Sequence, residues 1–185
     1  PQSPAAAAKA LEEFFQPEIE TIAPLPGARE TLDRLRDRGI RTAILSNATS
    51  GAYVTRAVAA MGWAGYFDPL IVSADIGVRK PHAEAFRAVL DQWPFPPNRV
   101  VMVGDSLYHD VMGAAGLGLH TIHFAAIENP FDEPYRARRP ASAKGGTLAA
   151  DRLRHEDPAV VAHERPRGPH AHALAVAHRD RVGHQ

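Results

Sequence analysis

Two kinds of apolar pattern alternate along residues 4–127. Near-continuous apolar runs of a few residues are typical of buried strands, and apolar residues three or four positions apart are typical of helices with one buried face. The expected strands are 40–45, 69–74, 99–104 and 120–125. The expected helices are 3–15, 26–39, 50–62, 82–93 and 108–118.

The helical segments carry clear signals of their own. In 26–39, Ala28, Leu32 and Leu35 fall on one face, and Gly39 is placed to end the helix. Strands that alternate with helices and are apolar along their length predict an α/β fold with a Rossmann-like parallel sheet and helices on both faces. Ligands of such sheets bind at the carboxyl ends of the strands.

The composition changes at about residue 128. Residues 128–185 are rich in Pro, Ala, Arg and His and show no sustained amphipathic period, which predicts a largely disordered tail. Six of the ten histidines lie there. Their spacing is irregular and no acidic cluster accompanies them, so the sequence does not favour a metal site in the tail.

Charge and cysteine content narrow the function classes. Lys plus Arg and Asp plus Glu balance at 21 each, which argues against nucleic acid or a membrane surface as a partner. The chain has no cysteine, which excludes disulfides and thiolate chemistry. It starts at Pro1 without a basic and apolar leader, and we expect a cytoplasmic protein.

Polar residues follow three of the expected strands. Ser46 and Asn47 follow the first, Lys80 comes in the loop after the second, and Asp105 and Asp110 follow the third. Each alone is most often a helix cap, a solvated loop charge or a turn. A hydroxyl, an amine and carboxylates at one edge of a sheet suit phosphoryl transfer, because positioning and charge neutralisation dominate that reaction. Asp105 also offers the hard oxygen ligands that Mg²⁺ prefers.

Three segments resemble motifs of a known family. "ILSNA", "GVRKP" with "HAEAF", and "VMVGDSLYHDV" resemble, in order and spacing, the second, third and fourth motifs of the haloacid dehalogenase-like hydrolases. The resemblance covers roughly residues 20–127 and is to the subfamily with a helical cap inserted after the first strand. The acidic fourth motif resembles that of the Mg²⁺-dependent phosphatases, so the resemblance implies an enzyme that hydrolyses a small phosphorylated metabolite.

The resemblance also implies roles for individual residues. Ser46 would bind a phosphoryl oxygen, Lys80 would steady the nucleophile and the phosphate, and Asn47 would line the pocket. Asp105 would ligate Mg²⁺, and Asp110 would support the metal site from the same loop.

The family's first motif is absent. Its nucleophile and its general acid–base residue form an Asp-x-Asp pair, and no two aspartates of this chain are separated by one residue. We therefore expect residues 1–24 to be a remnant of the cap and 25–127 to be the core, without its first strand. That strand would lie between 40–45 and 100–103, and its loss would leave two unpaired strand edges.

Two other functions stay open at this point. One is a 2-haloacid dehalogenase with the same fold and no metal. The other is a non-catalytic remnant or binding module, because the nucleophile motif is missing. Neither the identity of the substrate nor the oligomeric state can be predicted from this sequence.

Overall fold

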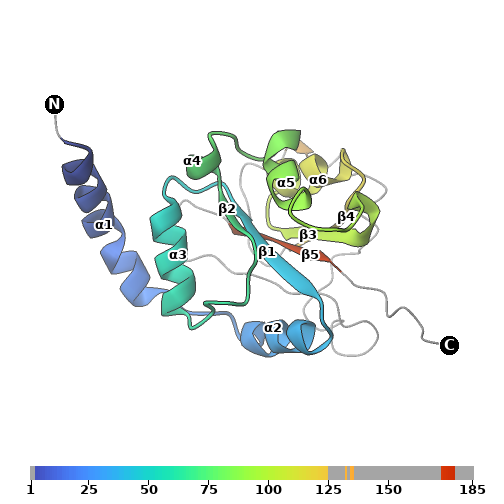
Figure 1. Ribbon diagram of the computed structural model, residues 1–185, viewed down its shortest axis with the longest axis horizontal. Helices are drawn as coiled ribbons and strands as arrows, with labels where there is room; N and C mark the ends of the chain where they lie inside the picture. The colour runs from blue at the N-terminus through green and yellow to red at the C-terminus, as the bar shows by residue number, and fades with distance from the viewer. Residues whose placement is uncertain (1–2, 125–131, 133, 136–171, 178–185) are drawn as a thin grey trace.

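The computed structural model describes residues 3–124, 132, 134–135 and 172–177. Helices and strands alternate along most of this length, as the apolar pattern predicts (Figure 1). In chain order, the elements are α1 (Pro4–Thr21), α2 (Ala28–Asp37), β1 (Arg41–Ser46), α3 (Gly51–Ala60), β2 (Leu70–Val72), α4 (Ser73–Ile76), α5 (Ala83–Leu90), a 3₁₀ turn (Pro97–Arg99), β3 (Val100–Gly104), a π-helical segment (Leu107–Met112), α6 (Gly113–Ala115), β4 (His120–His123) and β5 (His172–Ala177).

The described strands form one sheet in the order β2-β1-β5-β3-β4. β1 pairs with β2 in parallel, and β3 pairs with β4 in parallel. β5 lies between β1 and β3 and is antiparallel to both. Its first residue, His172, is in register with Ser46, so β5 begins at the edge where the parallel strands end.

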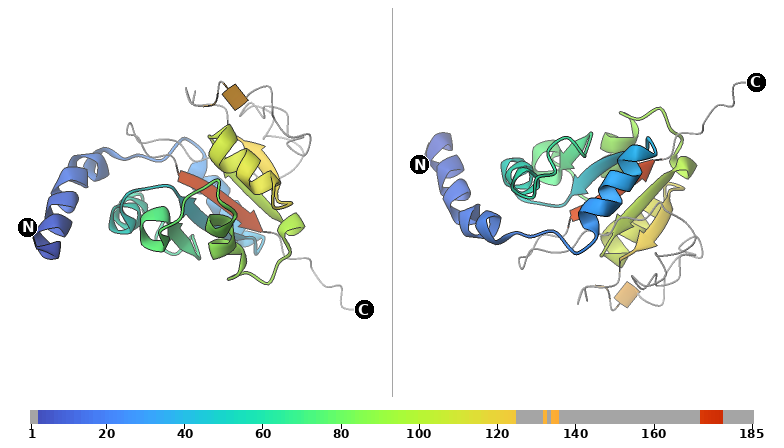
Figure 2. Two further views of the ribbon diagram at one scale, coloured as in Figure 1. Left: turned by 90° about the horizontal axis from the view of Figure 1, so that it is seen from above. Right: turned by 90° about the horizontal axis from the view of Figure 1, so that it is seen from below.

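Helices cover both faces of the sheet (Figure 2). α2 and α3 pack on one face with Ile44 and Val103, and α5 and α6 pack on the other with Leu45 and Met102. Adjacent residues of β1 and of β3 thus enter opposite cores, because successive strand side chains point to opposite faces. The expected fold class, α/β with helices on both faces of the sheet, is confirmed, but the expected parallel sheet is mixed because β5 runs antiparallel to both its neighbours.

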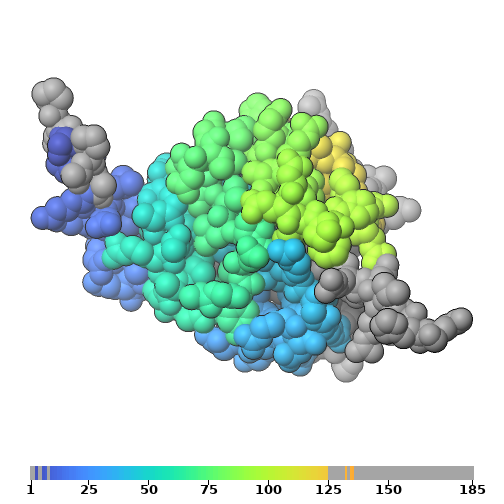
Figure 3. All heavy atoms as spheres, viewed as in Figure 1, coloured from blue at the N-terminus to red at the C-terminus, as the bar shows by residue number. Residues whose placement is uncertain are grey.

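Helix α1 lies outside these layers and packs against α3. Ser3 caps its amino end by accepting a hydrogen bond from the backbone N–H of Ala6 (3.2 Å). The ring of Phe15 stacks on that of Tyr53, with centroids 4.3 Å apart. Figure 3 shows α1, in dark blue, at one end of the molecule. Among the described helices, none has both the length and the apolar character needed to cross a membrane.

Several expected elements have different bounds in the structure, and two of these differences have a clear physical cause. The strand expected over 69–74 is limited to β2, and the chain turns into the short helix α4 at Ser73. The Ser73 hydroxyl donates to the carbonyl of Ala48 (3.1 Å), which holds the chain at this turn. The first helix continues beyond residue 15 and through Pro17 to Thr21. The packing of its buried residue Phe15 on Tyr53 of α3 helps to hold the helix here, although Pro17 cannot donate a backbone hydrogen bond.

The tail differs from the expectation at 172–177. We expected residues 128–185 to be largely disordered, but this segment forms β5. The physical reason lies in the edges of β1 and β3, whose backbone N–H and C=O groups need partners. A short apolar segment, "HALAVA", supplies them on both sides. Apart from Asp132, Pro134 and Tyr135, the rest of the expected tail lies outside the described residues.

Candidate active site

The polar residues singled out in the sequence meet at one edge of the sheet. Ser46 is the last residue of β1, and Asp105 directly follows β3. Lys80 lies between α4 and α5, and Asp110 lies in the π-helical segment after β3. All four are buried, with exposed fractions of 4% or less. The structure therefore places these four side chains, out of water, at the edge of the sheet where β1 and β3 end.

Lys80 is the centre of this group. Its ammonium nitrogen donates to the carbonyl oxygen of Leu45 (2.6 Å) and lies 2.9 Å from Oδ1 of Asp110. Both side chains of this ion pair are 2% exposed. A buried ammonium group needs such partners because removing it from water is costly. Its third N–H can donate to a ligand.

Asn47 holds the backbone of Lys80 from both sides. Its amide nitrogen donates to the Lys80 carbonyl (2.9 Å), and its amide oxygen accepts from the Lys80 N–H (2.8 Å). The side chain thus couples the loop after β1 to the loop that carries Lys80. This contact differs in kind from the pocket-lining role that the family resemblance implied for Asn47.

Asp110 connects Lys80 to the loop after β3. Oδ1 faces the Lys80 ammonium group, and Oδ2 accepts from the backbone N–H of Ser106 (3.0 Å). Gly104 makes this approach possible, since a Cβ atom there would overlap the Asp110 carboxylate. The glycine of the fourth motif is therefore explained by packing against this carboxylate.

Replacing Gly104 with alanine is expected to lower the free energy of unfolding by about 1–3 kcal/mol, because the added methyl group must displace a buried, ion-paired carboxylate. Gly116→Ala is a matched control, since a Cβ atom there would meet its nearest neighbour, the Met112 carbonyl oxygen, at 3.5 Å. Urea denaturation measures both. Equal stability of the two variants would contradict the packing described for Gly104.

The carboxylates of this site fit a magnesium ion only as a partial ligand set. Asp105 provides hard oxygen atoms at the sheet edge, and Asp110 is engaged with Lys80 and Ser106. In the part of the chain that the structure describes, no group of three or more acidic or histidine side chains is placed to hold a metal ion. Mg²⁺ is commonly bound by one or two carboxylates together with water and substrate phosphate, which this donor set allows.

A histidine beside the site has a shifted pKa. Burial lowers the pKa of His109 below its ordinary value, and the positive charges of Arg79 and Lys80 act in the same direction. The negative charges of Asp110 and Asp132 oppose the shift. The neutral form of the His109 imidazole is therefore favoured over the protonated form. Its Nδ1 lies 3.1 Å from the hydroxyl oxygen of Ser106.

Sequence reasoning missed Ser106, which lies in the loop after β3, and missed His123 and Asp132, which contact this loop. Asp132 is 3% exposed, and its Oδ2 accepts from the backbone N–H of Leu107 (2.8 Å). No motif or period marks Asp132, which stands in the segment we expected to be disordered.

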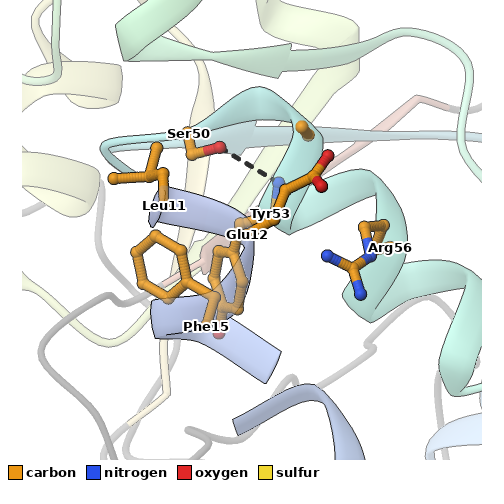
Figure 4. Close-up of a pocket in the computed structure, with 7 residues that line it drawn as sticks. Leu11, Glu12, Phe15, Ser50, Tyr53 and Arg56 are labelled. Atoms are coloured by element: carbon orange, nitrogen blue, oxygen red, sulfur yellow. Dashed lines mark hydrogen bonds between the residues drawn. The ribbon is translucent and has the colours of Figure 1, made fainter. Parts of the chain in front are cut away.

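A cavity of about 90 Å³ lies between α1 and α3 (Figure 4). Most of its wall comes from apolar side chains, including Leu11, Phe15 and Tyr53. Burial, with a hydrogen bond to Glu18, raises the pKa of the Tyr53 phenol. This cavity is not lined by the cluster around Lys80. It lies beside the start of α3, which follows the segment that carries Ser46 and Asn47.

Comparison with known families shows to which family the chain belongs. The profile of the haloacid dehalogenase-like hydrolases matches residues 3–118, and the chain belongs to this family. A glyceraldehyde 3-phosphate phosphatase of Pyrococcus furiosus is 32% identical over 103 residues, 56% of this chain and 42% of that protein. The chain spans about half the length of the curated relatives it matches.

Solved structures of the same family resemble the fold. A phosphatase from Thermococcus onnurineus has a TM-score of 0.57 at 27% identity, covering 65% of this chain and 56% of that one. An L-2-haloacid dehalogenase from Xanthobacter autotrophicus has a TM-score of 0.53 at 25% identity, covering 70% of this chain and 49% of that one. The fold is therefore shared by enzymes of two reaction types.

Proposed function

We propose that this chain carries the phosphate- and magnesium-binding part of a phosphatase that acts on a small phosphate monoester. One observation carries the proposal: Lys80, buried and ion-paired with Asp110, lies at the sheet edge where Ser46 and Asp105 follow two strands. The phosphatase names of several curated relatives support it. The positive charge of Lys80 suits an anionic ligand, and the carboxylate of Asp105 suits a cation that accompanies it.

In this proposal, each residue has a role set by its contacts. The Ser46 hydroxyl donates to a phosphoryl oxygen, and the third N–H of Lys80 donates to a second oxygen. Asn47 keeps Lys80 at its place by holding its backbone. Asp105 ligates Mg²⁺, and Asp110 supports the site by orienting Lys80. When bound, Mg²⁺ neutralises negative charge on the phosphoryl group.

The reaction also needs a nucleophile that attacks phosphorus and an acid that protonates the leaving group. In the family, an Asp-x-Asp pair does both, and this chain has none. The proposal therefore assigns binding and charge neutralisation to the described residues. It assigns the covalent step to a strand that ends in Asp-x-Asp and takes the central position that β5 holds here.

Release of p-nitrophenol from p-nitrophenyl phosphate tests this division. One form is the chain as it stands. A second form replaces residues 172–185 with an added amino-terminal strand that ends in Asp-x-Asp. Turnover is expected only from the second form, and only with Mg²⁺. Ser46→Ala and Asp105→Asn in the second form are expected to lower kcat/KM by about a hundredfold or more, since each removes a group aimed at the phosphoryl charge.

The result that would contradict the proposal is turnover that persists in a chelator and survives Asp105→Asn. The second candidate function, metal-free dehalogenation, is favoured by the structural likeness to the L-2-haloacid dehalogenase. Chloride released from 2-chloropropionate in the presence of a chelator would support it. Two carboxylates follow β3, and that of Asp110 balances the charge of Lys80. The second, Asp105, offers the oxygen ligands that a cation prefers, which favours the phosphatase.

A further inference from the structure

Asp132 holds the loop that follows β3. Its Oδ2 accepts from the backbone N–H of Leu107 (2.8 Å), and its Oδ1 accepts from the hydroxyl of Ser106 (3.3 Å). The carboxylate is 3% exposed. A carboxylate removed from water persists in a fold when hydrogen bonds compensate its charge, and here both donors belong to the segment between Asp105 and Asp110.

The Asp132 carboxylate also lies near His123, which contacts the backbone of Asp105. Nε2 of His123, at the end of β4, lies 3.7 Å from Oδ2 of Asp132 and 3.1 Å from the carbonyl oxygen of Asp105. His123 thus stands between Asp132 and the backbone of Asp105. The loop is held at its beginning through His123 and in its middle by two direct hydrogen bonds.

A separate contact attaches this part of the chain to the π-helical segment. The ring of Tyr135 stacks on that of Tyr108, with centroids 4.6 Å apart and planes 19° apart. Tyr135 also packs against the buried side chains of Leu107 and Val111. Tyr135, three residues after Asp132, therefore packs against the segment that follows β3 independently of the Asp132 hydrogen bonds.

We propose that Asp132 is a positioning residue for the magnesium site. By fixing the backbone at 106–107, it holds Asp105 and Asp110 in the relative placement that a cation and a phosphate need. This inference rests on the proposed function, which assigns Mg²⁺ to this loop. Residues that orient metal ligands without touching the metal commonly set its affinity.

The test compares Asp132→Ala and Asp132→Asn with the unaltered chain. Asp37→Ala, on the exposed side of α2, is the control. Isothermal titration with MgCl₂ gives the dissociation constant, and amide hydrogen exchange gives the protection of residues 105–110. The alanine variant is expected to bind Mg²⁺ about tenfold more weakly or worse, and the asparagine variant within about threefold, because its amide oxygen still accepts from Leu107. The loop amides are expected to exchange faster in the alanine variant alone.

A merely structural role predicts a different result. It would lower the thermal stability of both variants without restoring Mg²⁺ affinity in the asparagine variant, and that pattern overturns the inference. An alanine variant with the unaltered dissociation constant also overturns it. If the unaltered chain binds no Mg²⁺, the proposed function fails and the inference fails with it, whereas Mg²⁺ binding that Asp132→Ala leaves unchanged overturns the inference alone.

Discussion

Replacing Lys80 with methionine is expected to lower the free energy of unfolding by about 3–5 kcal/mol, because it leaves the buried Asp110 carboxylate without its counter-charge. The two groups are 2.9 Å apart and each side chain is 2% exposed. Methionine keeps most of the length and apolar volume of the lysine side chain. The decrease in the free energy of unfolding therefore comes mainly from loss of the Lys80 charge. Urea denaturation followed by circular dichroism measures it.

Two further variants separate the ion pair from general effects of substitution. Lys80→Met combined with Asp110→Asn removes both charges and is expected to recover much of the loss. Lys9→Met removes an ion pair with Glu13 at 3.7 Å whose side chains are 77% and 70% exposed, and should change stability by about 0.5 kcal/mol or less. A Lys80 variant as stable as the Lys9 variant would contradict the buried ion pair.

Ala175→Pro is expected to lower the free energy of unfolding by about 3 kcal/mol or more, because proline cannot donate to the ladder and its ring crowds a neighbouring strand. Ala175 pairs with Ala43 of β1 on one side and with Met102 of β3 on the other. Breaking β5 therefore exposes the edges of two buried strands at once. Urea denaturation and hydrogen exchange of the β1 and β3 amides measure the effect.

Ala175→Gly is the matched control, since glycine keeps the backbone N–H. It should cost about 1 kcal/mol at most, through added freedom of the unfolded chain. If the proline variant has the stability of the glycine variant and the β1 amides stay protected, then β5 does not hold the centre of the sheet. The two parallel pairs would in that case be joined in another way.

The apolar pattern was sufficient for most of the fold. The near-continuous apolar segments at 40–45 and 99–104 predicted a sheet buried on both faces, and Ile44 and Leu45 do enter opposite cores. The end of β2 could not be predicted, because a tertiary hydrogen bond from Ser73 to the Ala48 carbonyl holds the turn there. β5 was missed because alanine has little preference for strands, and its place depends on two edges far away in sequence.

The residues of the candidate site could be predicted where a polar residue comes directly after a strand. Ser46 ends β1 and Asp105 follows β3, and these two strands run in the same direction on either side of β5, so both residues lie at the same edge of the sheet. The partners within the site were not predictable. The pairing of Asn47 with the Lys80 backbone and the contact of Asp132 with Leu107 join segments 25 or more positions apart. Such contacts follow from tertiary packing, which no local pattern encodes.

The most direct test of the proposed site is binding of inorganic phosphate, measured by isothermal titration with and without Mg²⁺. We expect binding that requires Mg²⁺ and that Asp105→Asn or Ser46→Ala weakens about tenfold or more, since each variant loses a charge-assisted contact. The measurement needs no nucleophile, so the missing Asp-x-Asp pair does not affect it. Phosphate that binds equally well in a chelator, or equally well to both variants, would contradict the assignment of this sheet edge as a phosphate and magnesium site.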